Sequence, residues 1–298
     1  MSQPDTHPAK LEFRGETMDS EHLKAITTYY GVSDLDCFDV SIHLEGLCNH
    51  VIIIDSSDVF RFPRAEWASV MLQNEIGLLA RLRNHGVMAV NECKHQGEGF
   101  GVFSFIKGAS LTTLALNRTT ESGWVSLARD LGRILGEIHS FPLESIHSSG
   151  ARRTREDWLQ FHQEAKAQYS HLTSTGVEFI ESVFAPIIDG SLSLEYQPRL
   201  IHGDLAPYHI KADLTAARIS GIIDFGEAGV GDPATDISCL IYNLGLPFVK
   251  AMDTYPYLGD TLKRALFYAR TLEVQWFVQS ARTKDPFWFG AHLGSYRG

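Results

Sequence analysis

Three side chains able to accept a proton or bind a cation lie close together in the C-terminal half of the chain: Asp204, His209 and Asp224. Asp204 follows a short apolar segment, and Asp224 ends a second one at residues 219–223. Two carboxylates and an imidazole on neighbouring hairpin-like elements can hold magnesium beside a phosphate and orient a hydroxyl nucleophile. An aspartate after a glycine is by itself a common loop residue. The paired Asp224 is what favours Asp204 as the base that accepts a hydroxyl proton.

An acidic block surrounds Asp224. Residues 219–249 contain no Lys or Arg, yet Asp224, Glu227, Asp232 and Asp236 all fall there. Such a block must face water or meet cations. Glu227 comes directly after the Asp224 turn, and its position is compatible with a contact either to the metal or to the acceptor.

The segment 200–236 resembles the aminoglycoside phosphotransferase family, the small-molecule branch of the protein-kinase-like fold. His202-Gly203-Asp204 stands at the family's catalytic loop, and Asp224-Phe225-Gly226 stands at its magnesium-binding turn, followed by the typical residues 231–236. The resemblance runs from about residue 25 to about residue 290. It implies an α+β, bilobal protein-kinase-like fold, with Mg²⁺ and ATP or GTP as cofactors.

The resemblance also assigns roles to the surrounding residues. Asp232 and Asp236 are expected to brace the catalytic loop, and His202 to be structural. His209 replaces the usual metal-ligating asparagine, as in the 2''-aminoglycoside and macrolide branches. Imidazole is a softer ligand than an amide oxygen. His209 is therefore expected to bind the metal, with the alternative that it donates a hydrogen bond to a carboxylate or a bound water.

A strand, a turn and a strand are indicated at residues 51–62, and a helix is indicated at residues 67–83. The apolar stripe of this helix is expected to run through Trp67, Met71 and further leucines, with Glu75 on the same face. A buried carboxylate needs a cation, and Arg61 is the nearest suitable one. The resemblance implies that Arg61 contacts the nucleotide phosphates and is held by Glu75. The alternative is a purely structural ion pair.

Four further residues are expected to contact the nucleotide, through the resemblance alone. Gly46 and Asn49 lie where the family has its phosphate loop, and Ser104 and Ile106 lie in the expected hinge at residues 103–111, where backbone groups contact the nucleobase. The glycine-rich residues 97–101 are expected to form a turn, because no helix follows them. No Walker-type phosphate loop is present.

The order of elements predicts two lobes. After a polar lead-in at residues 1–16, most strands come first and most helices later. Helices are indicated at residues 20–30, 127–138, 152–170, 176–188, 237–244 and 261–281. Ser20 is the expected cap of the first helix, and Gly31 is its expected stop. Residues 1–106 are therefore expected to form the nucleotide-binding lobe, and residues 107–298 a helical lobe with the catalytic loop and the acceptor site. His139, at the end of an apolar stripe, is expected to be a structural core residue.

Composition narrows the partners. The chain has 298 residues, of which 44% are hydrophobic, and a formal net charge of −10. This charge argues against nucleic acid as a partner, whereas it suits a cationic small molecule or simply solubility. The four cysteines are widely spaced, and neither a signal sequence nor a membrane-spanning run is visible. We expect a cytoplasmic protein, monomeric or homodimeric.

The acceptor is expected to be a hydroxylated small molecule. An aminoglycoside antibiotic, whose ammonium groups need carboxylates, is the favoured acceptor, with Glu227, Glu273 and Trp276 as candidate contacts. The largely apolar residues 237–248 would instead suit a macrolide, and a metabolite is a third possibility. A catalytically dead binding module is a fourth reading, but such proteins usually lose the base or the metal aspartate, and Asp204 and Asp224 are both present.

Overall fold

The computed structural model describes residues 10–13, 16–44, 46, 48–144, 146 and 154–284. The start of the polar lead-in, at residues 1–9, lies outside this part. The chain divides into two compact units, residues 1–107 and 108–298, one residue away from the expected boundary. The first unit is built mainly from strands and the second mainly from helices, which confirms the predicted α+β class.

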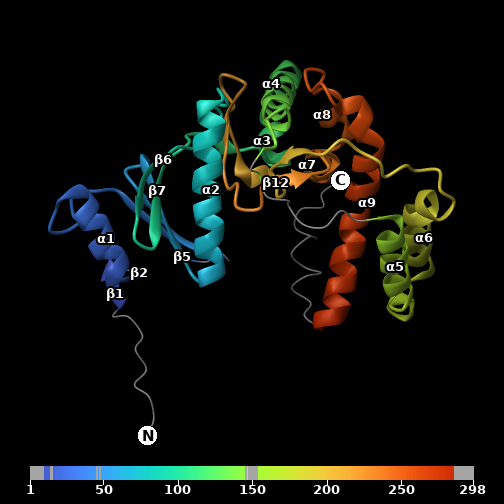
Figure 1. Cartoon of the computed structure of the whole chain (residues 1–298), viewed down its shortest axis with the longest axis horizontal. Coiled ribbons are helices and arrows are strands. Elements are labelled where there is room, and N and C mark those ends of the chain that lie inside the picture. Colours follow the sequence, from blue (N-terminus) through green and yellow to red (C-terminus); the bar gives the residue numbers. More distant parts are fainter. Residues whose placement is uncertain are drawn as a thin grey trace, which may run out of the picture. The chain divides into compact units, whose positions relative to one another are not determined.

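Unit 1 contains one antiparallel sheet of five strands in the order β3-β4-β5-β7-β6. Its strands are β3 (Val40–His43), β4 (Asn49–Ile54), β5 (Asp58–Pro63), β6 (Cys93–Gly97) and β7 (Phe100–Ser104). A hairpin of β1 (Lys10–Phe13) and β2 (Glu16–Asp19) precedes helix α1 (Ser20–Tyr30), and helix α2 (Glu66–Asn84) follows β5. Helix α2 packs on β5 and β6 (Figure 1).

The predicted strand and turn signals of this sheet are confirmed. The β4–β5 hairpin turns at Asp55 and Ser56, which both have positive φ, and the Ile54 carbonyl accepts from the Ser57 N–H at 2.9 Å. Positive φ at both central residues gives the turn type whose twist matches that of paired strands. The glycine-rich segment forms the β6–β7 turn, with Gly99 at φ 77°. Neighbouring strands are therefore joined tightly, and this holds Arg61 in the middle of β5.

Helix α2 buries most of the predicted stripe, including Glu75, Leu78 and Leu82, but not the first residue of that stripe. Its buried residues are Ala68, Leu72, Glu75, Leu78, Leu79 and Leu82, whereas the side chain of Trp67 is 54% exposed. One helical residue corresponds to a rotation of about 100°. The small Ala68 side chain occupies the buried face at the first turn, and this leaves Trp67 turned toward solvent. The prediction was wrong at Trp67 and right at Glu75.

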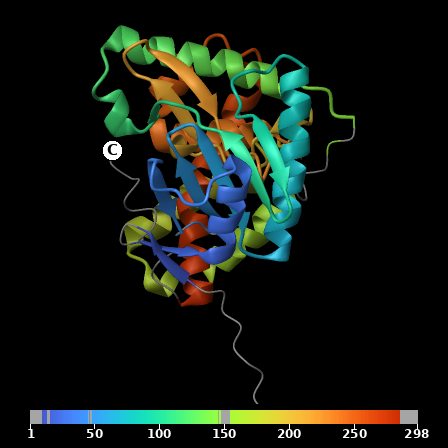
Figure 2. The same cartoon turned by 90° about the vertical axis from the view of Figure 1, so that its left-hand side faces the viewer.

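The N-cap residue of helix α1 lies one position earlier than predicted. Asp19, not Ser20, is the N-cap residue, while Gly31 ends the helix in a left-handed conformation at φ 68°, as expected. Its buried Ile26 packs with Met18 and with Ile52, Phe60 and Val102 of the sheet. Figure 2 shows α1 together with the strands of this sheet.

Unit 2 begins with β8 (Ala109–Ser110), α3 (Thr113–Leu116) and α4 (Glu121–His139). Helices α5 (Arg155–Lys166) and α6 (Ser174–Ile188) flank the short η1 (Tyr169–His171). The segment that carries the acidic motifs comprises β9 (Arg199–Ile201), η2 (Pro207–His209), β10 (Ile210–Asp213), β11 (Arg218–Ile222) and β12 (Gly229–Gly231). Helices α7 (Ala234–Leu244), α8 (Leu246–Lys250) and α9 (Leu258–Thr283) complete the described part.

Two small sheets and a helical core position the acidic segment. The sheets have the orders β11-β10-β8 and β12-β9. The predicted stripe of α4 is confirmed, since Leu127, Leu131, Ile134, Leu135 and Ile138 are all fully buried. Helices α5, α6 and α9 share a second hydrophobic cluster and lie side by side in Figure 1.

One helix of unit 2 ends earlier than the sequence predicts. The helix expected at residues 152–170 ends at Lys166 and is followed by η1; residues 152 and 153 lie outside the described part.

In the described part of the chain, no helix is long and apolar enough to cross a membrane.

Candidate active site

The loop that carries Asp204 depends on a glycine. Strand β9 delivers the buried Leu200 and Ile201 into the loop that begins at His202. Gly203 has a φ of 85°, and a Cβ at this position would lie 2.4 Å from the Glu227 backbone oxygen. A side chain here would therefore meet both a strained conformation and a backbone atom that cannot move away. This glycine lets the loop lie directly against the turn that follows Asp224.

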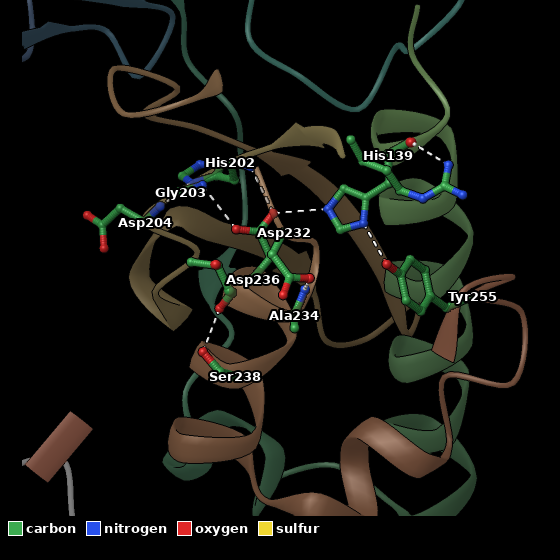
Figure 3. A network of polar contacts seen from close by, with 11 residues as sticks. His139, His202, Gly203, Asp204, Asp232, Ala234, Asp236, Ser238 and Tyr255 are labelled. Carbon is green, nitrogen blue, oxygen red and sulfur yellow. Dashed lines mark hydrogen bonds and ion pairs between the residues drawn. The ribbon is translucent and has the colours of Figure 1, made fainter. Parts of the chain in front are cut away.

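The side chain of Asp236 supports the loop that begins at His202 (Figure 3). Its carboxylate, fully buried at the start of α7, accepts hydrogen bonds from the His202 N–H at 2.8 Å and the Gly203 N–H at 3.0 Å. His139 Nε2 lies 3.0 Å from the same carboxylate, and its Nδ1 lies 2.6 Å from the Tyr255 hydroxyl. The structural roles predicted for His139 and Asp236 agree with these contacts. Burial opposes ionisation of Asp236, but the His139 and backbone hydrogen bonds outweigh it and lower its pKa.

His202 joins the loop to the strand that carries the second acid. Its Nδ1 accepts the Asp204 N–H at 3.3 Å, so its Nε2 carries the proton and donates to the Ile223 carbonyl at 3.0 Å. Burial lowers the pKa of His202, which keeps the ring neutral near pH 7. His202 thus ties Asp204 to the residue just before Asp224 without adding a charge.

His209 makes a second bridge between the same two segments. It lies at the end of η2, and its Nδ1–H donates to the Asp204 carbonyl at 2.8 Å. Its Nε2 lies 3.3 Å from Asp224 Oδ2. Asp224 itself adopts a φ of 69°, an uncommon conformation that Asp and Asn tolerate better than most residues. The structure therefore brings together Asp204, His209 and Asp224, the predicted base and the two predicted metal ligands.

The carboxylates of both acids are accessible. The Asp204 side chain is 52% exposed and the Asp224 side chain is 47% exposed. Figure 3 shows the Asp204 side chain directed away from the buried network around Asp236. The loop is thus held through its backbone, which leaves the Asp204 carboxylate available to a ligand.

The His209 and Asp224 atoms fit a shared divalent cation. Because Nδ1 carries a proton, the neutral ring presents the Nε2 lone pair toward Asp224. Two adjacent ligands of an octahedral Mg²⁺ at roughly 2.1 Å lie about 3 Å apart, close to the separation found here. When no cation is bound, a proton on Nε2 can instead pair with the Asp224 carboxylate in the same arrangement. Burial opposes that proton, but the Asp224 carboxylate outweighs the effect and raises the pKa of His209.

Asp232 has a different role from the one expected. Its carboxylate pairs with Arg264 Nε at 2.8 Å, accepts from the Tyr268 hydroxyl at 3.1 Å and accepts from the Ala234 N–H at 3.0 Å. These partners belong to α9 and to the start of α7. Asp232 therefore connects α7 to α9, and of the two acids it is Asp236 whose carboxylate is hydrogen-bonded to the loop that carries Asp204.

The predicted acceptor residues lie in two places. Glu227 is exposed on the turn against Gly203, whereas Glu273 and Trp276 are half-buried on α9. Trp276 lines a cavity of about 450 Å³ together with residues of α5, among them Asp157 and Glu164. Tyr208, which carries no sequence signal of its own, is 57% exposed, and its ring contacts His209 edge-on at 4.4 Å. Its position beside the predicted metal ligand is the only sign of a functional role.

In unit 1, the predicted pairing of Arg61 with Glu75 is confirmed. Arg61 NH1 lies 2.9 Å from both carboxylate oxygens of Glu75, and both side chains are buried. The guanidinium also lies over the ring of Phe103, 4.8 Å from its centre. The pair is therefore held in a fixed position on the sheet.

The other four predicted nucleotide contacts lie at opposite ends of β5. Asn49 pairs with Pro63 at one end, and the Arg64 side chain donates to the Gly46 carbonyl at 2.7 Å beside it. Ser104 pairs with Asp58 at the other end, and Ile106 follows two residues later. The distance along β5 is roughly 17 Å, at about 3.4 Å per residue. Arg61 lies between the two ends.

A family model decides the identity. The model of the phosphotransferase enzyme family, APH, matches residues 42–258, a span that includes Arg61, Asp204 and Asp224. The chain belongs to the APH phosphotransferase family. This confirms the resemblance given by the catalytic loop and the Asp224 turn.

Solved structures share the fold of this phosphotransferase. The GDP complex of wild-type aminoglycoside 2'-phosphotransferase-IIIa matches with a TM-score of 0.76 and 22% identity, over 92% of this chain and 95% of that one. ADP-bound aminoglycoside phosphotransferase APH(2'')-Ib matches with a TM-score of 0.70 and 20% identity, over 93% and 96%. Macrolide 2'-phosphotransferase MphH from Brachybacterium faecium matches with a TM-score of 0.68 and 21% identity, over 91% and 96%.

A curated relative gives no further assignment. The uncharacterized protein YcbJ of Bacillus subtilis (strain 168) is 32% identical over 109 residues, which span 36% of this chain and 35% of that protein. The match thus covers about a third of that relative's length.

Titration of His209 tests whether this residue of the phosphotransferase binds the metal. Without metal, we expect NMR of the imidazole to show a pKa above the ordinary value of about 6.5, because Asp224 favours the charged ring. Magnesium with nucleotide should lower that pKa, since a cation on Nε2 displaces the proton. Magnesium affinity should accordingly weaken as the pH falls. A pKa that magnesium leaves unchanged would contradict metal binding by His209.

Variants of the Arg61–Glu75 pair separate a nucleotide contact from a purely structural ion pair. Arg61→Ala should raise the nucleotide KM at least about tenfold, and it should also destabilise the protein because Glu75 stays buried without its partner. The double variant Arg61→Met/Glu75→Leu removes both charges and should recover much of the stability. A stable double variant that still has a normal nucleotide KM would show that the pair is structural only.

Proposed function

We propose that this phosphotransferase transfers the γ-phosphate of ATP or GTP to a hydroxyl group of a small molecule and requires Mg²⁺. The observation that carries the proposal is the joint placement of Asp204 and Asp224. Two histidines connect their segments, and both carboxylates remain accessible. A base aimed at an alcohol and a metal-binding acid at a fixed separation are the parts that phosphoryl transfer needs.

Asp204 acts in this proposal as the general base. Its loop is held by three backbone contacts, to Asp236, His202 and His209, so the carboxylate can turn toward a hydroxyl without moving the chain. Asp224 and His209 would hold the Mg²⁺, which when bound neutralises charge on the nucleotide phosphates. His209 also keeps the Asp204 carbonyl in place through its other nitrogen.

The nucleotide is proposed to lie along β5 of unit 1. Ser104 and Ile106 mark the end for the nucleobase, Gly46 and Asn49 mark the end for the phosphates, and Arg61 lies between them. An arginine fixed by Glu75 presents donors to phosphate oxygens. Solved complexes with GDP and with ADP among the similar proteins support a purine nucleotide, and both ATP and GTP belong in the assay.

An aminoglycoside is the acceptor that we favour. The net charge of −10 suits a polycation. Glu227 is exposed next to the catalytic loop, and burial raises the pKa of Glu273, which an ammonium group would reverse. Trp276 lines one cavity with Asp157 and Glu164, and Glu164 is paired there with Arg282, so the aromatic face is the part of the lining best suited to a cationic ring. Similar proteins have been solved with kanamycin and with gentamicin.

A macrolide is the second candidate, supported by one exposed aromatic side chain. Tyr208 offers an apolar ring beside His209. The apolar residues 237–248 add less support than their sequence suggests, because Ile237, Leu240 and Phe248 are buried in the core of unit 2. Their hydrophobicity is explained by packing. A hydroxylated metabolite remains the third acceptor class to be tested.

A panel of acceptors tests the proposal. Purified protein with Mg²⁺ and ATP or GTP is expected to release nucleoside diphosphate only when an accepted alcohol is present, and mass spectrometry should find that acceptor heavier by one phosphate. The panel should contain aminoglycosides, macrolides and small hydroxylated metabolites. Asp204→Asn protein serves as the matched inactive control. Silence with every acceptor, together with retained nucleotide binding, would favour the binding module over the enzyme.

We also propose a cytoplasmic protein that is monomeric or homodimeric and binds no nucleic acid. The cysteines support a reducing compartment, because Cys37, Cys93 and Cys239 form no disulfide in the structure. The net negative charge opposes binding to polyphosphate chains. Light scattering of the purified chain measures the oligomeric state directly.

A further inference from the structure

Two histidines and an aspartate converge in unit 1, where no sequence motif marks a site. Asp19 and His22 lie at the junction of β2 and α1, and His50 lies near the start of β4. Asp19 Oδ2 is 3.8 Å from His22 Nδ1 and 3.9 Å from His50 Nδ1. One ligand atom from each residue lies within 4.8 Å of the other two. The side chains are 14% to 23% exposed, so the cluster is shielded but open to solvent.

The contacts of Asp19 and His22 do not account for this arrangement. Asp19 is the N-cap residue of α1, a position where a carboxylate usually accepts a backbone N–H, yet its side chain makes no such capping bond. The carboxylate is turned toward the two imidazoles instead. His22 Nδ1 is buried and has no hydrogen-bond partner in the structure. A buried polar atom without a partner is costly, and a ligand on that atom would remove the cost.

The ring of His22 is also held in place. It stacks on Phe62 with centroids 4.0 Å apart and meets His50 edge-on at 5.3 Å. Phe62 belongs to the core of unit 1, so the orientation of Nδ1 is set by packing. A preset donor direction is what a metal ligand requires.

We propose that Asp19, His22 and His50 bind a divalent transition-metal ion, with zinc as the expected occupant. Two imidazole nitrogens and one carboxylate oxygen form a donor set that suits zinc and its neighbours, whereas magnesium and calcium prefer oxygen. Ligand atoms on a tetrahedral zinc, at about 2.05 Å, lie roughly 3.3 Å apart. The pairs at 3.8 and 3.9 Å therefore need to close by about half an ångström, and the two histidine nitrogens, which lie within 4.8 Å of one another, by about 1.5 Å at most. A water would complete the coordination.

Such an ion would join two parts of unit 1 that are distant in sequence. It would link the start of α1 to β4, directly after the residues 46–49 that are proposed to contact the nucleotide phosphates. The expected consequence is a unit 1 that resists thermal unfolding better with zinc than without it, because the ion binds the folded arrangement only.

Cobalt binding to the full-length chain without an affinity tag tests the site. His209→Ala protein is used as the background, so that the proposed magnesium ligand cannot contribute a nitrogen. We expect one equivalent of Co²⁺ to give the visible absorption of a low-coordinate nitrogen-ligated ion, and Zn²⁺ to displace it. His22→Gln and His50→Gln should each weaken binding by 10-fold to 100-fold or more. His85→Gln, which removes an exposed histidine of the same unit, should change nothing.

A milder variant protects the test against misfolding. Asp19→Asn keeps the shape of the residue and should still weaken Co²⁺ binding and abolish the rise in melting temperature caused by Zn²⁺. Circular dichroism verifies that each variant is folded. Co²⁺ binding that is absent from the His209→Ala background, or is unchanged in the Asp19, His22 and His50 variants, would overturn the proposal.

Discussion

Asp204→Asn is expected to lower kcat by roughly 10²-fold to 10⁴-fold, because an amide cannot accept the hydroxyl proton. Nucleotide KM should change little, since the loop is held through its backbone and the carboxylate itself is 52% exposed. The folded structure should also persist, because Asn has the same shape as Asp. Steady-state kinetics with the acceptor found in the panel measures both constants.

Asp253→Asn is the matched control for this substitution. Asp253 is an exposed aspartate in the same unit, paired at the surface with Arg129. Its loss should leave kcat unchanged, because exposed ion pairs contribute little. A near-normal kcat for Asp204→Asn would show that Asp204 is not the general base. The exposed Glu227 would then be the next residue to substitute.

Asp236→Asn is expected to destabilise the protein by about 2–4 kcal/mol at pH 7 and to reduce kcat as well. The two carboxylate oxygens accept the His202 and Gly203 N–H groups separately, and His139 shares one of them. An amide has one oxygen and one NH₂, so one of the buried N–H groups must face another donor. The loop that carries Asp204 would lose part of its hydrogen bonding to residue 236. Urea unfolding of both proteins measures the difference.

The stability difference between the wild type and Asp236→Asn is expected to change with pH in one direction. The pKa of Asp236 is lowered in the folded protein, so the charged carboxylate contributes stability above the unfolded value of about 3.9 and loses it as the pH falls through the folded pKa. The stability gap between the wild type and Asp236→Asn should therefore be full at neutral pH and shrink below about pH 4. A gap that does not vary with pH would show that shape, not charge, is the cause. Asp253→Asn should stay within about 0.5 kcal/mol of the wild type.

Local patterns predicted the parts of the fold that local physics controls. The apolar stripe of α4, the strands around the Asp55 turn and the stop at Gly31 depend on side-chain period and on backbone conformations that few residues adopt. The demand of a buried Glu75 for a cation is a local rule too, and Arg61 was the nearest cation in the chain. These predictions needed no knowledge of distant residues.

Predictions failed where the outcome depends on a distant neighbour. At the first turn of α2 the buried residue is Ala68 and Trp67 is exposed, an outcome that the apolar period of the helix alone did not decide. Asp232 and Asp236 stand in the same motif, but Arg264 lies near the first and the catalytic loop lies near the second. In the apolar segment 237–248, only the folded structure shows that Ile237, Leu240 and Phe248 are buried in the core.

The amino-acid sequence by itself determined the α+β plan and the family, because residues 200–236 match the family's motifs and strands precede helices along the chain. The proposed reaction is what membership of that family implies. Only the tertiary structure decided what each of these residues touches. His202 and His209 each bridge the Asp204 loop to the Asp224 segment, and Asp19 meets His22 and His50 across α1 and β4. Such contacts depend on how whole elements pack, and packing is a property of the folded chain that no short segment contains.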